Sequence, residues 1–102
     1  MAEFVTVAKT ADVPEGTAKA FNVGTKSVAV FHQAGGRWHA IDDYCPHMGA
    51  SLAEGTLSDD IVECPWHAWR FRISDGTWVN SPKLKIGCYE VRINGEDIQV
   101  KL

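Results

Sequence analysis

Two short cysteine–histidine pairs constrain this 102-residue chain more than any other feature. Cys45-Pro46-His47 and Cys64-Pro65-Trp66-His67 are separated by the sixteen residues 48–63. Thiolate sulfur and imidazole nitrogen both bind iron and zinc, and four such groups in two tight pairs are difficult to explain as core packing. The sequence therefore predicts that the two pairs lie on neighbouring loops and hold one metal centre, with the ligands Cys45, His47, Cys64 and His67.

Short alternating stretches of apolar and polar residues, separated by turn residues, predict strands along most of the chain. The expected strands are Phe4–Ala8, Lys19–Val23, Ser27–Phe31, Arg37–Ile41, Ile61–Glu63, Arg70–Ile73, Thr77–Val79, Tyr89–Ile93 and Ile98–Val100. Asn94-Gly95 between the last two is a strong hairpin signal. A short helical turn is expected only within 48–57. This pattern predicts an all-β fold, a small antiparallel sandwich or barrel.

The length of the chain suits a single domain over residues 1–102. Ten basic and thirteen acidic residues give a net charge of −3, which argues against a general nucleic-acid binder. No apolar run approaches the roughly 18 residues that cross a membrane, and the start of the chain does not resemble a signal peptide. If two of the three cysteines bind metal, Cys88 is left alone, which indicates a reducing cytoplasm. We expect Cys88 to be a small buried apolar residue.

The segments 45–50 and 64–71 resemble the Rieske iron–sulfur family, and the resemblance extends through the flanking strands to most of the chain. The likeness is greatest to small bacterial Rieske-type ferredoxins and to the related small subunit of NAD(P)H nitrite reductase. It implies a Rieske-like antiparallel β-sandwich or barrel base that carries a small cluster-binding subdomain over about 43–80. It also implies a Rieske-type [2Fe–2S] cluster, with Cys45 and Cys64 on one iron and His47 and His67 on the other.

A structural zinc site is the alternative for the same four ligands, because zinc also accepts two cysteines and two histidines. Zinc fingers usually place both cysteines in one knuckle and both histidines on a helix. Here each loop offers one cysteine and one histidine, which favours two irons with different ligand sets. Neutral imidazoles in place of two thiolates make such a cluster easier to reduce, with potentials of roughly −150 to +300 mV.

Four positions beside the ligands predict a potential near the bottom of that range. High-potential Rieske proteins of cytochrome bc complexes have a disulfide at the positions that match Ala50 and Trp66. They also have a serine and a tyrosine, whose hydroxyls donate to sulfur, at the positions that match Trp69 and Phe71. Donors to sulfur stabilise the reduced cluster, so their loss lowers the potential.

The resemblance implies an electron-transfer protein that is not catalytic on its own. The first hypothesis is a carrier of single electrons from an NAD(P)H-dependent flavoprotein reductase to a terminal oxygenase or other oxidoreductase. The alternative is the small subunit of an assimilatory NAD(P)H nitrite reductase, bound to the large subunit. The second alternative is a structural zinc-binding interaction module. The sequence identifies neither the partners nor the pathway.

Three further groups of residues carry expectations that the structure can test. Acidic residues near the ligands form either a solvated surface or a collar that steers a basic partner; they are Asp42, Asp43, Glu54, Asp59, Asp60 and Glu63. Trp38 and Trp78 are expected to pack the base, and Trp69 to lie close to the cluster. Residues 80–82, Asn-Ser-Pro, are either a loop that covers the cluster or a plain turn.

Overall fold

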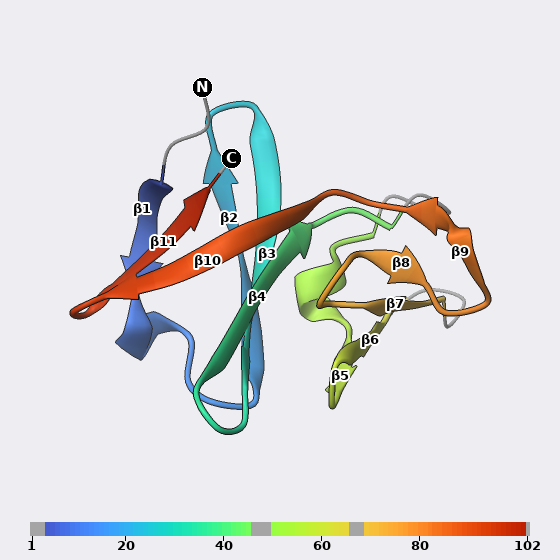
Figure 1. The fold of residues 1–102 in the computed structure, drawn as a ribbon, viewed down its shortest axis with the longest axis horizontal. Helices are drawn as coiled ribbons and strands as arrows, with labels where there is room; N and C mark the ends of the chain where they lie inside the picture. The colour runs from blue at the N-terminus through green and yellow to red at the C-terminus, as the bar shows by residue number, and fades with distance from the viewer. Residues whose placement is uncertain (1–3, 46–49, 66–68, 102) are drawn as a thin grey trace.

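The computed structural model describes residues 4–45, 50–65 and 69–101, and it places eleven strands and two 3₁₀ turns in these ranges. The strands form one six-stranded and one five-stranded sheet, and every pairing between neighbouring strands is antiparallel. Figure 1 shows the larger sheet on the left and the smaller one on the right. The all-β prediction is therefore confirmed. In the described ranges, no helix has the length and apolar character needed to cross a bilayer.

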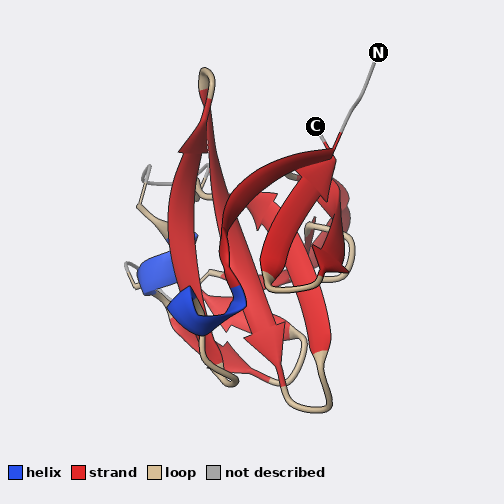
Figure 2. Ribbon diagram, turned by 90° about the vertical axis from the view of Figure 1, so that its left-hand side faces the viewer, coloured by secondary structure: helices blue, strands red, loops and turns tan. Residues whose placement is uncertain are grey.

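The six-stranded sheet, which we call the base, has the strand order β1-β11-β10-β4-β3-β2. Its strands are β1 (Phe4–Lys9), β2 (Thr17–Val23), β3 (Lys26–Gln33), β4 (Arg37–Asp42), β10 (Cys88–Asn94) and β11 (Asp97–Lys101). The sheet curls until its edge strands β1 and β2 come into contact, which makes a nearly closed barrel (Figure 2). Asn94 pairs with Asp97 across the β10–β11 turn, as the Asn-Gly signal predicted.

The five-stranded sheet, which we call the small sheet, is inserted between β4 and β10. Its strands, in chain and sheet order, are β5 (Thr56–Ser58), β6 (Ile61–Glu63), β7 (Arg70–Arg72), β8 (Thr77–Trp78) and β9 (Ser81–Lys85). The 3₁₀ turn η2 (Leu52–Glu54) precedes β5 and lies between the two sheets (Figure 1). The chain thus leaves the base once, builds the small sheet, and returns once.

The two faces of strand β3 contribute to two different cores, which explains the unbroken apolar run Val28–Phe31 within it. Val28 and Val30 face the inside of the barrel, in a base core completed by Val13, Ala40, Ile98 and Val100. Ala29 and Phe31 face the small sheet, because successive residues of a strand point to opposite sides. They contribute to an intersheet core that also contains Ile41, Cys45, Ala50, Leu52, Val62, Cys64, Phe71, Ile73 and Ile86.

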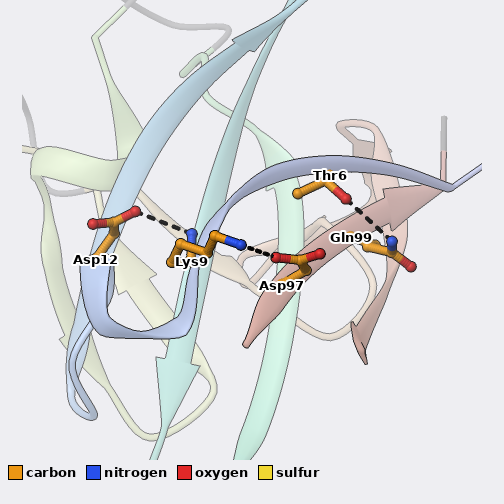
Figure 3. A network of polar contacts seen from close by, with 5 residues as sticks. All are labelled: Thr6, Lys9, Asp12, Asp97 and Gln99. Atoms are coloured by element: carbon orange, nitrogen blue, oxygen red, sulfur yellow. Dashed lines mark hydrogen bonds and ion pairs between the residues drawn. The ribbon is translucent and has the colours of Figure 1, made fainter. Parts of the chain in front are cut away.

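A polar network on the surface of the base fastens β1 to β11 (Figure 3). The Lys9 ammonium pairs with the Asp97 carboxylate, and the Gln99 amide donates to the Thr6 hydroxyl at 3.1 Å. The Lys9 backbone N–H donates to Asp12 at 3.0 Å, at the 3₁₀ turn η1 (Thr10–Asp12). These exposed contacts each contribute little to stability, and their role is to set the register of the first strand.

Three elements of the structure were not expected from the sequence. The 3₁₀ turn η1 lies outside 48–57, where the helical turn was expected and where η2 is found. Strand β5 has three residues, of which only Leu57 is apolar, so the sequence carries little signal for a strand there. The third is β9, which begins at Ser81 and contains Pro82, within the stretch expected to be a loop or turn. Because β9 is an edge strand, a proline there need not remove a ladder hydrogen bond.

Candidate metal centre

Both predicted cysteine ligands are buried in the intersheet core. Cys45 follows the end of β4 and is 0% exposed, and Cys64 follows β6 directly and is 2% exposed. The histidines of the two pairs, His47 and His67, lie outside the described residues. The structure thus brings the two thiol-bearing residues into one core, from two segments far apart in the sequence.

The two cysteines begin loops that are closed by the same hydrogen bond. The backbone N–H of Cys45 donates to the carbonyl of Ala50 at 2.9 Å, and that of Cys64 donates to the carbonyl of Trp69 at 2.6 Å. In both cases the acceptor lies five positions after the cysteine. We call residues 45–50 the first ligand loop and residues 64–69 the second ligand loop. The backbone of each cysteine is therefore held by an equivalent hydrogen bond.

Asp43 supports the first ligand loop from both sides. Its carboxylate accepts hydrogen bonds from the Ser51 hydroxyl, at 2.7 and 2.8 Å, and from the backbone N–H of Ala53, at 2.8 Å. Its own backbone N–H donates to the carbonyl of Ser27 in the base at 2.9 Å. One carboxylate before Cys45 thus binds the chain after Ala50, and it caps η2, whose first N–H groups would otherwise lack partners.

Aromatic side chains support the second ligand loop. The rings of Trp69 and Trp78 are stacked, with centroids 4.3 Å apart and planes inclined by 13°. Phe71, which is 0% exposed, pairs with Trp78 across β7 and β8. The expectation that Trp78 packs the base is therefore wrong, because Trp78 lies in the small sheet and packs against the intersheet core. Trp38 does pack against the base core, as expected.

The acidic residues near the ligands divide into two groups. Asp42 and Asp43 accept hydrogen bonds from within the chain, so their carboxylates have structural partners. Glu54, Asp59 and Glu63 are exposed and Asp60 is half-buried. Asp59 occupies the β5–β6 turn with a positive φ of 54°, a conformation that aspartate tolerates better than most residues. Any acidic collar therefore consists of four residues and not six.

Cys88 is exposed, so the expectation that it is buried is wrong. It is the first residue of β10, where fewer neighbours cover a side chain than in the middle of a strand. Its thiol donates to the carbonyl of Ser74 at 3.3 Å, and partial desolvation raises the pKa of the thiol. Cys88 thus differs from Cys45 and Cys64 in both burial and position.

Comparison with known proteins gives one family. A family model described as the Rieske [2Fe-2S] domain matches residues 3–90. The 3-phenylpropionate/cinnamic acid dioxygenase ferredoxin subunit of Shigella flexneri serotype 5b is 40% identical over 94 residues, which cover 90% of this chain and 87% of the relative.

Solved structures show the same fold. The ferredoxin of carbazole 1,9a-dioxygenase from Nocardioides aromaticivorans has a TM-score of 0.86 at 30% identity, covering 95% of each chain. An NADH-dependent nitrite reductase small subunit from Mycobacterium tuberculosis has a TM-score of 0.91 at 22% identity, covering 100% of this chain and 96% of the other. At that identity the second likeness shows the fold alone.

Proposed function

This chain belongs to the Rieske [2Fe–2S] domain family, and from that premise we propose that it carries single electrons to the terminal oxygenase of a dioxygenase system. Its cofactor is a Rieske-type [2Fe–2S] cluster, which accepts and releases one electron at a time. The proposed electron donor is an NAD(P)H-dependent flavoprotein reductase. We place the protein in the cytoplasm, where its exposed third thiol would stay reduced.

We propose that Cys45 and Cys64 bind one iron of the cluster and that His47 and His67 bind the other. The burial of both cysteines in one apolar core, in loops with the same closure, supports this assignment. We also propose that residues 1–102 form one Rieske domain with a cluster-binding subdomain over about 43–80, from the end of β4 to the turn after β8.

The role as a ferredoxin is favoured by two relatives that are at least 30% identical in sequence. The relative that is 40% identical is named as the ferredoxin subunit of a dioxygenase, and the solved structure that is 30% identical is the ferredoxin of another. The nitrite reductase small subunit remains the second candidate, because its fold matches over the whole chain. The iron–sulfur cofactor of the family argues against a zinc-binding module.

Metal analysis of the anaerobically reconstituted protein tests the proposed ligands. We expect about two irons and two acid-labile sulfides per chain, a red-brown colour and an EPR signal after reduction with dithionite. Cys45→Ser and Cys64→Ser should each lose the colour, whereas the control Cys88→Ser should keep it. Wild-type protein without iron and sulfide, or a Cys88→Ser variant as pale as the other two, would contradict the assignment.

Two measurements separate a diffusible carrier from a bound subunit. A carrier should elute as a free small protein from extracts of its own cells, and NADH should reduce it only after a flavoprotein reductase is added. A nitrite reductase subunit should instead elute with a large siroheme-containing chain. Stable co-elution with such a chain would replace the first proposal with the second.

A further inference from the structure

In the residues that the structure describes, a tryptophan ring is stacked on a neighbouring ring at two places. Trp69 and Trp78 form one pair in the small sheet, with centroids 4.3 Å apart. Trp38 and His32 form the other in the base, with centroids 3.8 Å apart and planes inclined by 14°. The geometry is similar, but only the first pair is connected to a ligand loop. The second pair therefore serves as an internal reference for what a stacked tryptophan does elsewhere in the fold.

Trp69 is connected to Cys64 through the backbone. Its carbonyl accepts the N–H of Cys64 at 2.6 Å and so closes the second ligand loop. Any movement of the Trp69 side chain that shifts its backbone therefore also shifts the backbone of the cysteine. Both tryptophans pack against the intersheet core, which contains Cys45 and Cys64.

Trp78 is held firmly enough to act as a fixed support. It pairs with Phe71 on β7 and with Ser81 on β9, so it lies between two strands. Next to it, the backbone N–H of Val79 donates to the carbonyl of Arg70 at 2.9 Å, which fixes the residue after Trp69. Trp78 lies outside both ligand loops, and its ring is stacked on Trp69, the last residue of the second ligand loop.

We propose that Trp78 is a positioning residue for the cluster: its ring holds Trp69 in place and thereby maintains the backbone hydrogen bond between Cys64 and Trp69. This inference rests on the proposed function, because it concerns the retention and potential of the proposed cluster. Aromatic stacking favours one geometry over others, whereas an aliphatic side chain of similar bulk fills space without that preference. Without the ring, the hydrogen bond from the Cys64 N–H to the Trp69 carbonyl should break more often.

Two consequences follow if this hydrogen bond breaks more often. The first is that water and oxygen reach the buried thiolate side of the cluster more often, so the cluster is lost faster. The second is that the reduced cluster, which carries the greater negative charge, is better solvated, so the potential rises. A residue that only stabilised the fold would change neither quantity at a temperature where the variant remains folded.

The experiment compares Trp78→Phe, which keeps a stacking ring, with Trp78→Leu, which keeps only apolar bulk. Trp38→Leu is the matched control, because it removes a stacked tryptophan from the base. Each protein is reconstituted anaerobically, and its fold is checked by far-UV circular dichroism. The loss of visible absorption in air is then timed at a fixed interval below each melting temperature. The midpoint potential is measured by voltammetry.

We expect Trp78→Leu to lose its cluster roughly threefold to tenfold faster than wild type, the range that stacking energies imply, and to have a raised potential. Trp78→Phe should remain within about twofold of wild type. Trp38→Leu should match wild type in both quantities. If Trp78→Leu does not fold, Trp78→Met replaces it, with the same expectation.

Equal rates for the phenylalanine and leucine variants, or an equal effect of Trp38→Leu, would overturn the inference. Failure of the proposed function looks different, because the wild-type protein would then take up no cluster at all.

Discussion

Asp42 and Gly87 form two reciprocal hydrogen bonds at the place where the chain leaves the base and returns to it. The backbone N–H of Asp42 donates to the carbonyl of Gly87 at 2.9 Å, and the N–H of Gly87 donates to the Asp42 carboxylate at 2.7 Å. The Tyr89 hydroxyl donates to the other carboxylate oxygen at 2.5 Å. The two connections between the base and the small sheet are therefore fastened to each other.

Gly87→Ala should destabilise the protein by about 2 kcal/mol through overpacking. A Cβ at this position would lie 2.6 Å from the Tyr89 hydroxyl oxygen and 2.7 and 2.8 Å from the Asp42 carboxylate oxygens. In an Asp42→Ala background the carboxylate is gone, so the same substitution should cost less. Urea unfolding of the four proteins in this cycle measures the coupling.

Gly24→Ala is the control for the cycle, because a Cβ there meets nothing within 4 Å and the only cost comes from a φ of +63°. Its effect should add to that of Asp42→Ala without coupling. If Gly87→Ala also adds without coupling, the contact between Asp42 and Gly87 does not hold the two connections together.

Stability at alkaline pH should depend on Tyr89. Burial, and then the hydrogen bond and charge of Asp42, raise the pKa of Tyr89 to about 12. The folded protein thus holds this proton more tightly than the unfolded chain, whose tyrosine pKa is about 10. The stability that results is fully present below about pH 10 and is lost as the pH rises through about 12. Unfolding free energies measured from pH 8 to 12 should fall for wild type, and this loss should be absent from Tyr89→Phe. An identical decline in both proteins would show that another group is responsible.

The sequence was sufficient to predict features whose residues carry their own signal. The run Val28–Phe31 indicated a buried strand, and its residues alternate between the two cores. The Asn-Gly pair indicated the turn between β10 and β11. The two cysteine–histidine pairs led to the prediction that Cys45 and Cys64 share one metal centre, which stays a prediction; the structure shows that both are buried in the intersheet core.

The missed features depend on contacts that no local pattern encodes. Strand β5 exists because Thr56–Ser58 pair with Ile61–Glu63, whereas its own sequence offers a single apolar residue, Leu57. Trp78 looks like any apolar core residue in the sequence, and only the order of strands in the small sheet places its ring on Trp69. Asp43 looked like one more surface acid, yet its carboxylate binds the chain beyond the first ligand loop. A carboxylate followed eight positions later by serine is too weak a pattern to be recognised.

Asp43→Ala should lower both stability and cluster retention. It removes the acceptor for Ser51 and Ala53, and the loss should cost about 2 kcal/mol because the acceptor is a partly buried charge.

Asp12→Ala is a suitable control, because it removes an exposed carboxylate that accepts one backbone N–H in the base. Its cost should be about 1 kcal/mol, with no change in the rate of cluster loss. Thermal unfolding and bleaching in air measure the two effects. Equal bleaching rates would mean that Asp43 does not organise the first ligand loop.

The exposed acidic residues near the ligand loops should accelerate electron transfer to a basic partner. Cytochrome c, a basic electron acceptor, is a practical probe. Changing both Glu54 and Glu63 to Gln should slow its reduction by the reduced ferredoxin about tenfold at low ionic strength. The difference should vanish in high salt, because exposed charges are then screened. Glu96→Gln, in the β10–β11 turn of the base, should have no effect. If the rate at which the wild-type protein reduces cytochrome c does not depend on ionic strength, the acidic residues do not steer the partner.

The reduction potential should lie near the bottom of the range of roughly −150 to +300 mV for Rieske centres, and a midpoint above roughly +100 mV would contradict this. Phe71 is 0% exposed in the core that contains both cysteines, and a phenyl ring has no donor for sulfur. Phe71→Tyr places a hydroxyl where high-potential relatives have one, so it should raise the potential measured by voltammetry.

Phe31→Tyr is the matched control, because Phe31 is equally buried in the same core but comes from the base. It should lose stability, since its buried hydroxyl lacks a sulfur partner, and it should keep the wild-type potential. If both tyrosine variants lose stability and neither changes the potential, the hydroxyl at position 71 does not reach the sulfur, and its absence does not explain a low potential.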